Sequence, residues 1–369
     1  MTPRTRPKPL VAATDAGRAW GGPRDSSVRP AYAGRVTTPL DQLSVLLLLS
    51  AMGLYAVAFV AFALDLGRRS SEAQAMADEA AARTAGSAVA SEAHGGTATL
   101  VAAPPSVAAP PRSNRRTAAR VALAVLTLGW VLHLGADVLR GIAAARVPWA
   151  NMYEFSMTGT LIIVGIYLLA LTRIDLRFLG AVITGLVLVL LGIATVGFRV
   201  AVSPLPPALQ SYWLVIHVFV AILGTAFFTL SGAVSAVQLV QARRERVLAA
   251  GRTADRVKLL ATVPTSTRLE NTAYRIAIVG FILWTFTLIA GAIWANHAWG
   301  RYWGWDTKEV WTFIIWVIYA GYLHARATRG WRGNGSGWLN LIGYAAVLFN
   351  FGVVNVFFHG LHAYSGLSS

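Results

Sequence analysis

Long apolar stretches alternate with short polar segments between residues 40 and 358. Eight stretches are apolar over roughly 18 to 28 residues, enough for a helix rising about 1.5 Å per residue to cross about 30 Å of hydrocarbon. They cover 40–66, 118–140, 156–174, 178–200, 212–240, 272–295, 308–326 and 338–358. The runs lack strict alternation and are too long for barrel strands. The pattern therefore predicts an all-α, polytopic membrane protein with about eight transmembrane helices.

The segments outside this core differ in composition. The tail 1–39 and the segment 67–117, rich in Ala, Ser, Pro and Thr, are predicted to be disordered. No apolar region with a cleavage site precedes Leu40, so we expect no removable signal peptide. The expected organisation is a first transmembrane helix at 40–66, a cytoplasmic disordered segment, and a seven-helix core at 118–366.

Composition and charge support this class and suggest an orientation. Hydrophobic residues make up 56% of the chain and charged residues 13%, too apolar for a soluble domain. The net charge of +16 does not indicate nucleic-acid binding, because 20 of the 32 basic residues lie in loops on one side of the predicted helices. Only five lie on the opposite side, so the richer side should be cytoplasmic. Seven more basic residues lie in the N-terminal tail. With eight transmembrane helices, this tail would lie outside the cytoplasm. Either this tail is translocated despite its charge, or a helix near it is miscounted.

A tryptophan-rich segment at 294–311 lies on the predicted outer side, between two apolar stretches. It contains five of the chain's 13 tryptophans. Tryptophan often gathers at membrane–water interfaces, so an aromatic belt is the simpler interpretation of any one of them. A belt does not explain why glycines and charges alternate with aromatic residues in 299–309. That alternation predicts a platform for a large planar ligand.

Histidines occur at both ends of the predicted helices. His217 is near the outer end of the fifth, His359 and His362 follow the eighth on that side, His324 is near the cytoplasmic end of the seventh, and His133 is within the second. Imidazole is a common axial ligand of haem iron, and the macrocycle also needs aromatic contacts and a cation near its propionates. On the outer side, His217 and His362 offer the imidazoles and the tryptophans offer the aromatic contacts. Arg301 and Lys308, beside the tryptophans, offer the cations. A structural histidine remains the simpler interpretation of each one alone. Metal transport is less favoured, because carboxylates near the histidines are scarce and the chain has no cysteine.

Five motifs in order give the chain a resemblance to a known family. They are PWANMYEF (148–155), SYWLVIHV (211–218), WGRYWGWDTKEVW (299–311), YLHAR (322–326) and FGVVNVFFHGLHAYSG (351–366). The third resembles the WWD signature of the haem-handling proteins of cytochrome c maturation. Together the motifs are similar to the CcsA/ResC branch of system II, whose actinobacterial members are often labelled CcsB. The resemblance covers about residues 120 to 366.

The resemblance implies a carrier that exports haem b and presents it outside the plasma membrane to the CxxCH motif of apocytochrome c. Carried over by motif, His217 and His362 correspond to the two external ligands of the haem iron, and His324 to an intramembrane histidine on the route. The macrocycle would lie against Trp299, Trp303 and Trp305, with Arg301 and Asp306 also in the site. Asp306 is further expected to cap the seventh helix and, with Glu309, to anchor the loop there. Asn151, Tyr153 and Glu154 are expected to brace this aromatic segment.

The resemblance also implies partners: a ResB/Ccs1-type membrane protein, apocytochrome c and thioredoxin-like reductants, besides membrane lipid. The chain offers no nucleophile or acid–base pair for thioether formation, so we expect part of a holocytochrome c synthase complex rather than a self-contained enzyme. Thr307 departs from the proline usual after the aspartate. His359 competes with His362 as a ligand, and His133 has no assigned role.

Two other functions stay open on the residues alone. A secondary transporter of an organic anion would use Arg301 and Lys308, and would show inverted repeats and broken helices at the midplane. A haem-bearing subunit of a respiratory complex would more naturally pair its histidines within facing helices at one level. No convincing repeat is seen, and the candidate ligands lie at the outer helix ends.

Overall fold

A computed structural model describes most of the core of this protein. The described residues are 39–92, 113–202, 205, 210–251, 259–328, 330–358 and 360–362, with 84–92 and 113–117 described as backbone only. The predicted disordered tail, residue 39 apart, lies outside this part, as do His94 and His359.

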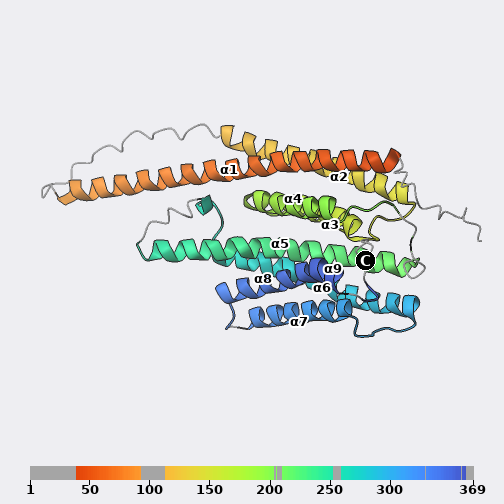
Figure 1. Ribbon diagram of the computed structural model, residues 1–369. Coiled ribbons are helices and arrows are strands. Elements are labelled where there is room, and N and C mark those ends of the chain that lie inside the picture. Colours follow the sequence, from red (N-terminus) through yellow and green to blue (C-terminus); the bar gives the residue numbers. More distant parts are fainter. Residues whose placement is uncertain are drawn as a thin grey trace, which may run out of the picture. The chain divides into compact units, whose positions relative to one another are not determined.

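The described residues form helices and no strands (Figure 1), which confirms the all-α prediction. The long helices are α1 (Pro39–Glu92), α2 (Ser113–Ala144), α3 (Met152–Leu171), α4 (Gly180–Gly197), α5 (Tyr212–Ala249), α6 (Ser266–Trp299), α7 (Thr307–Ala327) and α8 (Asn334–Phe349). A 3-10 turn, η1 (Arg177–Leu179), precedes α4. After α8 the chain continues through a π-helical turn, η4 (Asn350–Val354), into the short α9 (Asn355–Phe357).

Seven helical spans in the described part of the chain are long and apolar enough to cross a membrane, so this is a multi-pass membrane protein. The exception among the long helices is α7, whose 21 residues include several tryptophans and tyrosines, His324 and Arg326. These polar and aromatic residues lower its mean hydropathy. The helix predicted at 308–326 is therefore present, and its crossing of the membrane stays a prediction.

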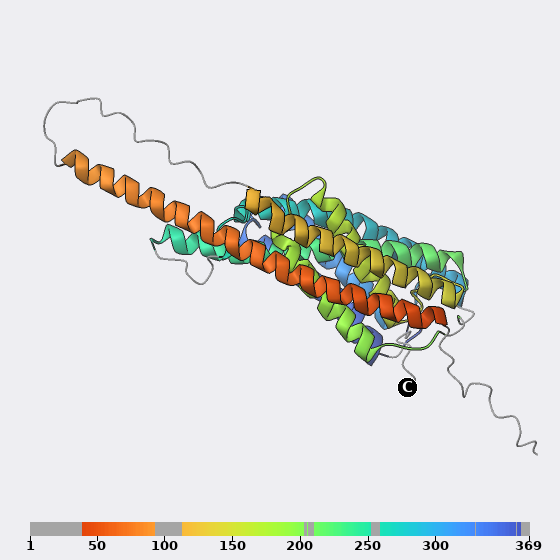
Figure 2. The same ribbon diagram turned by 90° about the horizontal axis from the view of Figure 1, so that it is seen from above.

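The helices pack side by side in two closely associated pairs. In both views α1 runs along α2, and α5 runs along α6 (Figures 1 and 2). Helix α4 packs on α1 and α3, while α8 packs on α5 and α7. One apolar core lies among α1 to α6, and a smaller aromatic one lies among α5 to α8 around Phe228, Trp284 and Tyr319. The loops that join α6 to α7 and precede α5 therefore lie at one common end of the bundle.

The prediction of disorder from residue 67 onward is wrong at the two ends of that segment. Helix α1 continues without a break to Glu92, and α2 already begins at Ser113. Alanine is the commonest residue in the extension of α1, and alanine, glutamate and arginine all favour helix even without burial. Ion pairs one turn apart add to this: Asp65 with Arg69 at 2.8 Å and Glu79 with Arg83 at 2.6 Å. Residues 93–112 lie outside the described part.

Candidate functional site

His217 lies in α5 and is held against α6. Its Nδ1 is 3.0 Å from the carbonyl oxygen of Thr287, and its ring stacks on Trp294 with centroids 5.8 Å apart. A Cβ on Gly291 would come within 2.7 Å of the imidazole, so glycine is what lets the ring lie so close to α6. A carbonyl only accepts hydrogen bonds, so Nδ1 carries the proton. Nε2 therefore keeps its lone pair and is available to a metal.

His362 lies in the chain segment after α9 and is oriented by Asp306. Its Nδ1 donates to Oδ2 of Asp306 at 2.8 Å, and the backbone N–H of Leu361 donates to the other carboxylate oxygen at 3.0 Å. The hydrogen bond from His362 lowers the pKa of the Asp306 carboxyl, which stays ionised as a result. A histidine whose Nδ1–H is bound by a carboxylate is the usual arrangement behind a metal-binding Nε2. Asp306 thus contributes through His362.

Asp306 also begins α7, as predicted. Its side chain accepts from the N–H of Lys308 at the first turn, and Glu309 accepts in return from the N–H of Asp306 at 3.0 Å, which completes a capping box. Glu309 also accepts from the N–H of Gly304 at 2.8 Å. Together these bonds fix the loop between α6 and α7, where Trp305 adopts a positive φ of 60°.

Four of the five tryptophans of this segment form two pairs. Trp294 and Trp299 contact each other and His362, with ring centroids 4.7 to 5.4 Å apart. Trp303 packs on Trp305 instead, and Trp305 is 74% exposed. Trp294, which also stacks on His217, was not among the predicted ligand contacts. Trp294 lies one turn after Gly291 on α6, so the two residues share one face of the helix. Because Gly291 lets His217 of α5 approach that face, Trp294 also lies against α5.

The two histidines line one cavity that opens to its surroundings, with about 1280 Å³ of empty space when the open part is included. Along α5 its lining reaches from Leu214 to Thr225, which corresponds to a depth of roughly 16 Å. The lining is mainly apolar, with polar side chains among it. The apolar part includes Val218, Ala221, Trp284, Leu288 and Val347, and the polar part includes His217, His362, Asn151, Tyr302 and Lys308. A cavity of this kind suits a flat, largely apolar ligand with polar groups at its edge.

The cation in this cavity is Lys308 and not Arg301. Lys308 lines the cavity, and its ammonium donates to Oδ1 of Asn355 at 2.6 Å and to the carbonyl oxygen of Asn350 in the π-helical turn at 3.0 Å. Both acceptors are neutral. The guanidinium of Arg301 instead lies over Gly304, where any Cβ would overlap it, and Arg301 is absent from the cavity lining. Lys308 is therefore the residue placed to meet a carboxylate of a bound ligand.

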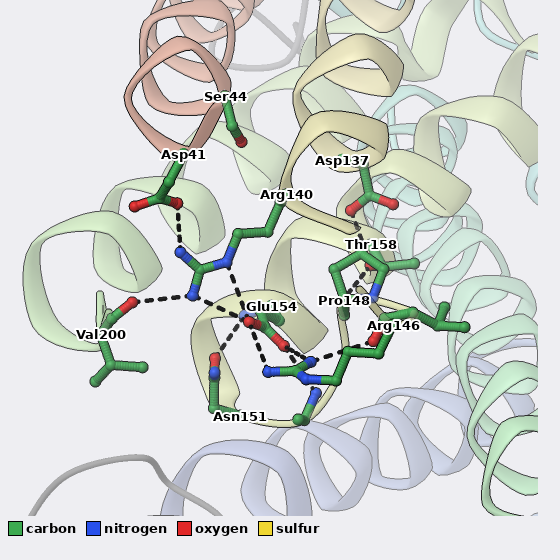
Figure 3. Close-up of polar contacts among 12 residues, drawn as sticks. Asp41, Ser44, Asp137, Arg140, Arg146, Pro148, Asn151, Glu154, Thr158 and Val200 are labelled. Carbon is green, nitrogen blue, oxygen red and sulfur yellow. Dashed lines mark hydrogen bonds and ion pairs between the residues drawn. The ribbon is translucent and has the colours of Figure 1, made fainter. Parts of the chain in front are cut away.

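The part of the cavity wall formed by Ala150 and Asn151 is held by a buried ionic network, shown in Figure 3. The Glu154 carboxylate accepts from Arg140 and Arg146, with N–O distances of 3.0 Å and 2.6 Å, and from the N–H of Ala150 at 3.0 Å. Asn151 caps α3 by accepting from the N–H of Glu154. Ala150 and Asn151 line the cavity, so Glu154 positions this wall from behind.

This arrangement corrects the expectation for Tyr153 and Glu154. Neither lines the cavity; the ring of Tyr153 lies against the guanidinium of Arg140 at 5.4 Å, and Glu154 is fully buried in the ionic network. Of the three residues expected to brace the tryptophan segment, Asn151 alone reaches the cavity lining. The sequence placed them correctly at one loop but did not show which way they face.

The other histidines lie away from this cavity. His324 is exposed near the opposite end of α7, roughly 24 Å along the helix from Lys308. His133 is fully buried between α2 and α1, with Nδ1 3.1 Å from the hydroxyl of Tyr55. The contact with Tyr55 supports a structural role for His133. The structure thus brings together His217 and His362 alone among the predicted ligands that it describes.

Asp306→Asn is expected to weaken ligand binding without unfolding the loop. Asparagine still caps a helix well, but its neutral amide no longer supports the Nδ1–H of His362 as a carboxylate does. Removing such a partner typically lowers metal affinity by about 10–100-fold. Haem titration of the purified protein measures this effect, with Asp175→Asn, an exposed carboxylate at the other end of the bundle, as the control. Equal affinities in the two variants would contradict the role assigned to Asp306.

Comparisons with known proteins identify the family to which the chain is similar. The chain matches the family model of the cytochrome C assembly protein over residues 149–362. It is 33% identical to the cytochrome c biogenesis protein CcsA of Heterosigma akashiwo, over 60% of this chain and 77% of the relative. It is 36% identical to CcsA of Prochlorococcus marinus over 62% and 78%, and 32% identical to CcsA of Synechococcus elongatus over 66% and 85%.

The family match begins at Trp149 and ends at His362, so it includes both cavity histidines, the tryptophan segment and the cavity wall before α3. Helices α1 and α2 lie outside it. Haem handling is implied for a family that assembles cytochrome c. The chain belongs to the CcsA family of cytochrome c assembly proteins, and it acts in system II cytochrome c biogenesis.

Proposed function

We propose that this protein exports haem b across the plasma membrane and presents it at the outer face to the CxxCH motif of apocytochrome c. One observation carries the proposal. His217 and His362 come from separate elements, line the same cavity, and each has its Nδ1 bound to a fixed acceptor. Two Nε2 atoms with free lone pairs are what axial ligation of haem iron requires.

The rest of the cavity also suits haem as cargo. Its largely apolar lining matches the porphyrin, and Trp294 beside both histidines offers an aromatic face. Lys308 supplies a positive charge for a propionate, in exchange for its neutral acceptors Asn350 and Asn355. Among the described residues, no group of three or more His, Asp or Glu side chains is placed to hold a bare metal ion. The donor set therefore favours a metal held within a macrocycle.

We infer from the side chains in the cavity which steps this chain carries out and which ones the apocytochrome and the partner proteins carry out. Two histidine ligands keep haem iron six-coordinate and unreactive until delivery, and the histidine of CxxCH then replaces one of them. The cysteine thiols of the apocytochrome add to the haem vinyl groups, so this chain contributes alignment and exclusion of water. A ResB/Ccs1-type partner and thioredoxin-like reductants would complete the complex.

The orientation follows from the distribution of basic side chains. The helix ends near the haem cavity carry few of them, and the opposite ends carry many, so the cavity should face outward. His324 lies near the inner end of α7, and we assign it to an earlier stage of the haem route. The organic-anion transporter is not favoured, because Arg301 is outside the cavity and the irregular turn η4 lies by the cavity histidines instead of midway along a span.

Transfer to a peptide tests the proposed function directly. The protein is purified with its membrane partner, loaded with haem, reduced, and mixed with an apocytochrome-derived peptide containing CxxCH. Haem should become covalently attached to this peptide, detected as colour that survives denaturing electrophoresis, and an AxxAH peptide should remain colourless. Failure to bind haem in any preparation, or equal labelling of both peptides, would contradict the proposal.

A further inference from the structure

A second cavity lies at the other end of the bundle, away from the histidines. It holds about 1110 Å³ of empty space when its open part is included. It is lined by α1, by the connection from α3 to α4, and by the start of α6 with the segment before it. Four arginines line it: Arg69, Arg173, Arg177 and Arg268. Three separate parts of the chain thus direct guanidinium groups to one place.

The charges in this cavity do not cancel. Arg69 pairs with Asp65 at 2.8 Å, and Arg177 lies 3.7 Å from Asp175. These two are the only carboxylates among the described lining residues. Arg173 and Arg268 form no ion pair with any carboxylate that the structure describes. The lining therefore carries two positive charges in excess.

Hydrogen bonds between distant segments hold the cavity in shape. The hydroxyl of Ser70 on α1 donates to the carbonyl oxygen of Leu259, and the hydroxyl of Tyr167 donates to that of Leu176 at 3.2 Å. The side chain of Glu245 on α5 accepts from both the N–H and the hydroxyl of Ser266 at the start of α6. The backbones that carry the four arginines are thus tied to neighbouring helices, and the cavity is part of the fold.

The position of the cavity indicates the kind of ligand. It lies where the membrane-crossing helix α3 ends and where the spans that include α4 and α6 begin, which is the level of the lipid headgroups. Leu66, Phe178 and Leu269 line it beside the guanidinium groups. Arginine binds phosphate oxygens through paired, charge-assisted hydrogen bonds. Basic pockets between helices at a membrane face are suited to anionic headgroups.

We propose that this cavity binds the phosphate headgroup of an anionic phospholipid, with Arg173 and Arg268 as the principal contacts. The apolar lining favours a lipid over free phosphate, because acyl chains remain attached beside the headgroup. The bound lipid joins α1 to α4 and α6, so it stabilises the packing of α1 on the family core. This site is independent of the haem cavity and of the function proposed for it.

Thermal unfolding of the full-length protein in a neutral detergent tests the site. Adding phosphatidylglycerol should raise the unfolding midpoint of the unmodified protein, whereas phosphatidylcholine should not. In the double variant Arg173→Gln/Arg268→Gln, the phosphatidylglycerol concentration needed for half the effect should rise at least about tenfold, because two charge-assisted contacts to the phosphate are lost. Both side chains are exposed in the absence of ligand, so the variant should fold.

Two controls make the result specific. The variant Arg243→Gln/Arg246→Gln removes the same number of charges from the C-terminal end of α5, outside this cavity. It should respond like the unmodified protein. Arg173→Lys/Arg268→Lys should recover part of the response. An equal response to phosphatidylcholine, or an unchanged response in the Gln double variant, would overturn the proposal. An equal response to glycerol phosphate would overturn the lipid as its source.

Discussion

Alanine at either His217 or His362 is expected to abolish the bis-histidine haem spectrum of the purified protein. Each imidazole provides one axial nitrogen, and each is oriented by its own acceptor, Thr287 or Asp306. Loss of an outer partner of a metal ligand already lowers affinity by about 10–100-fold, so loss of the ligand itself should lower haem affinity by more than about 100-fold. The visible spectrum of the reduced protein, purified with its partner, measures the effect.

Imidazole separates loss of a ligand from loss of the fold. Added imidazole should enter the space left by the missing side chain and restore a six-coordinate spectrum in either variant. His297→Ala is a matched control, because His297 is exposed near the end of α6 that carries Trp294 and is not among the residues that line the cavity. Unchanged spectra in both alanine variants would remove His217 and His362 as ligands. Attention would then turn to His359, His324 and His133.

Arg140→Met is expected to cause the largest loss of stability in the described part of the chain. The guanidinium of Arg140 is fully buried, and it joins Asp41 of α1, Glu154 of α3 and the carbonyl oxygen of Val200 (Figure 3). Breaking a buried ion pair by removing one partner typically costs about 3–5 kcal/mol, because the remaining charge stays buried without compensation. Here Asp41 and Glu154 would both lose the Arg140 guanidinium, and Glu154 would keep its pair with Arg146. Denaturant unfolding in detergent measures the change.

An exposed pair on the same protein provides the comparison. Arg83 pairs with Glu79 at 2.6 Å, and both side chains are about two-thirds exposed. Arg83→Met should change stability by less than about 1 kcal/mol, as is typical of surface ion pairs. Equal effects of the two substitutions would contradict a structural role for the buried network. Arg140→Met should also reduce haem binding, because Glu154 holds the cavity wall at Ala150 and Asn151.

Local features of this protein were readable from the sequence. The positions of the helices follow from runs of apolar residues, and the capping box of Asp306 and Glu309 follows from two residues three positions apart. Both depend on neighbours along the chain. The apolar pattern does not predict the extension of α1 to Glu92, because this alanine-rich segment is helical through intrinsic propensity and not through a long apolar run.

The helical membrane class, the family motifs and the histidines at positions 217 and 362 can all be identified in the sequence. Tertiary packing sets what those two side chains contact, since His217 meets Thr287 70 residues away and His362 meets Asp306 56 residues away. It likewise places Lys308 in the cavity lining and Arg301 outside it. Hydropathy and capping depend on neighbours along the chain, whereas the direction of a side chain depends on helices packing together from distant parts of the chain.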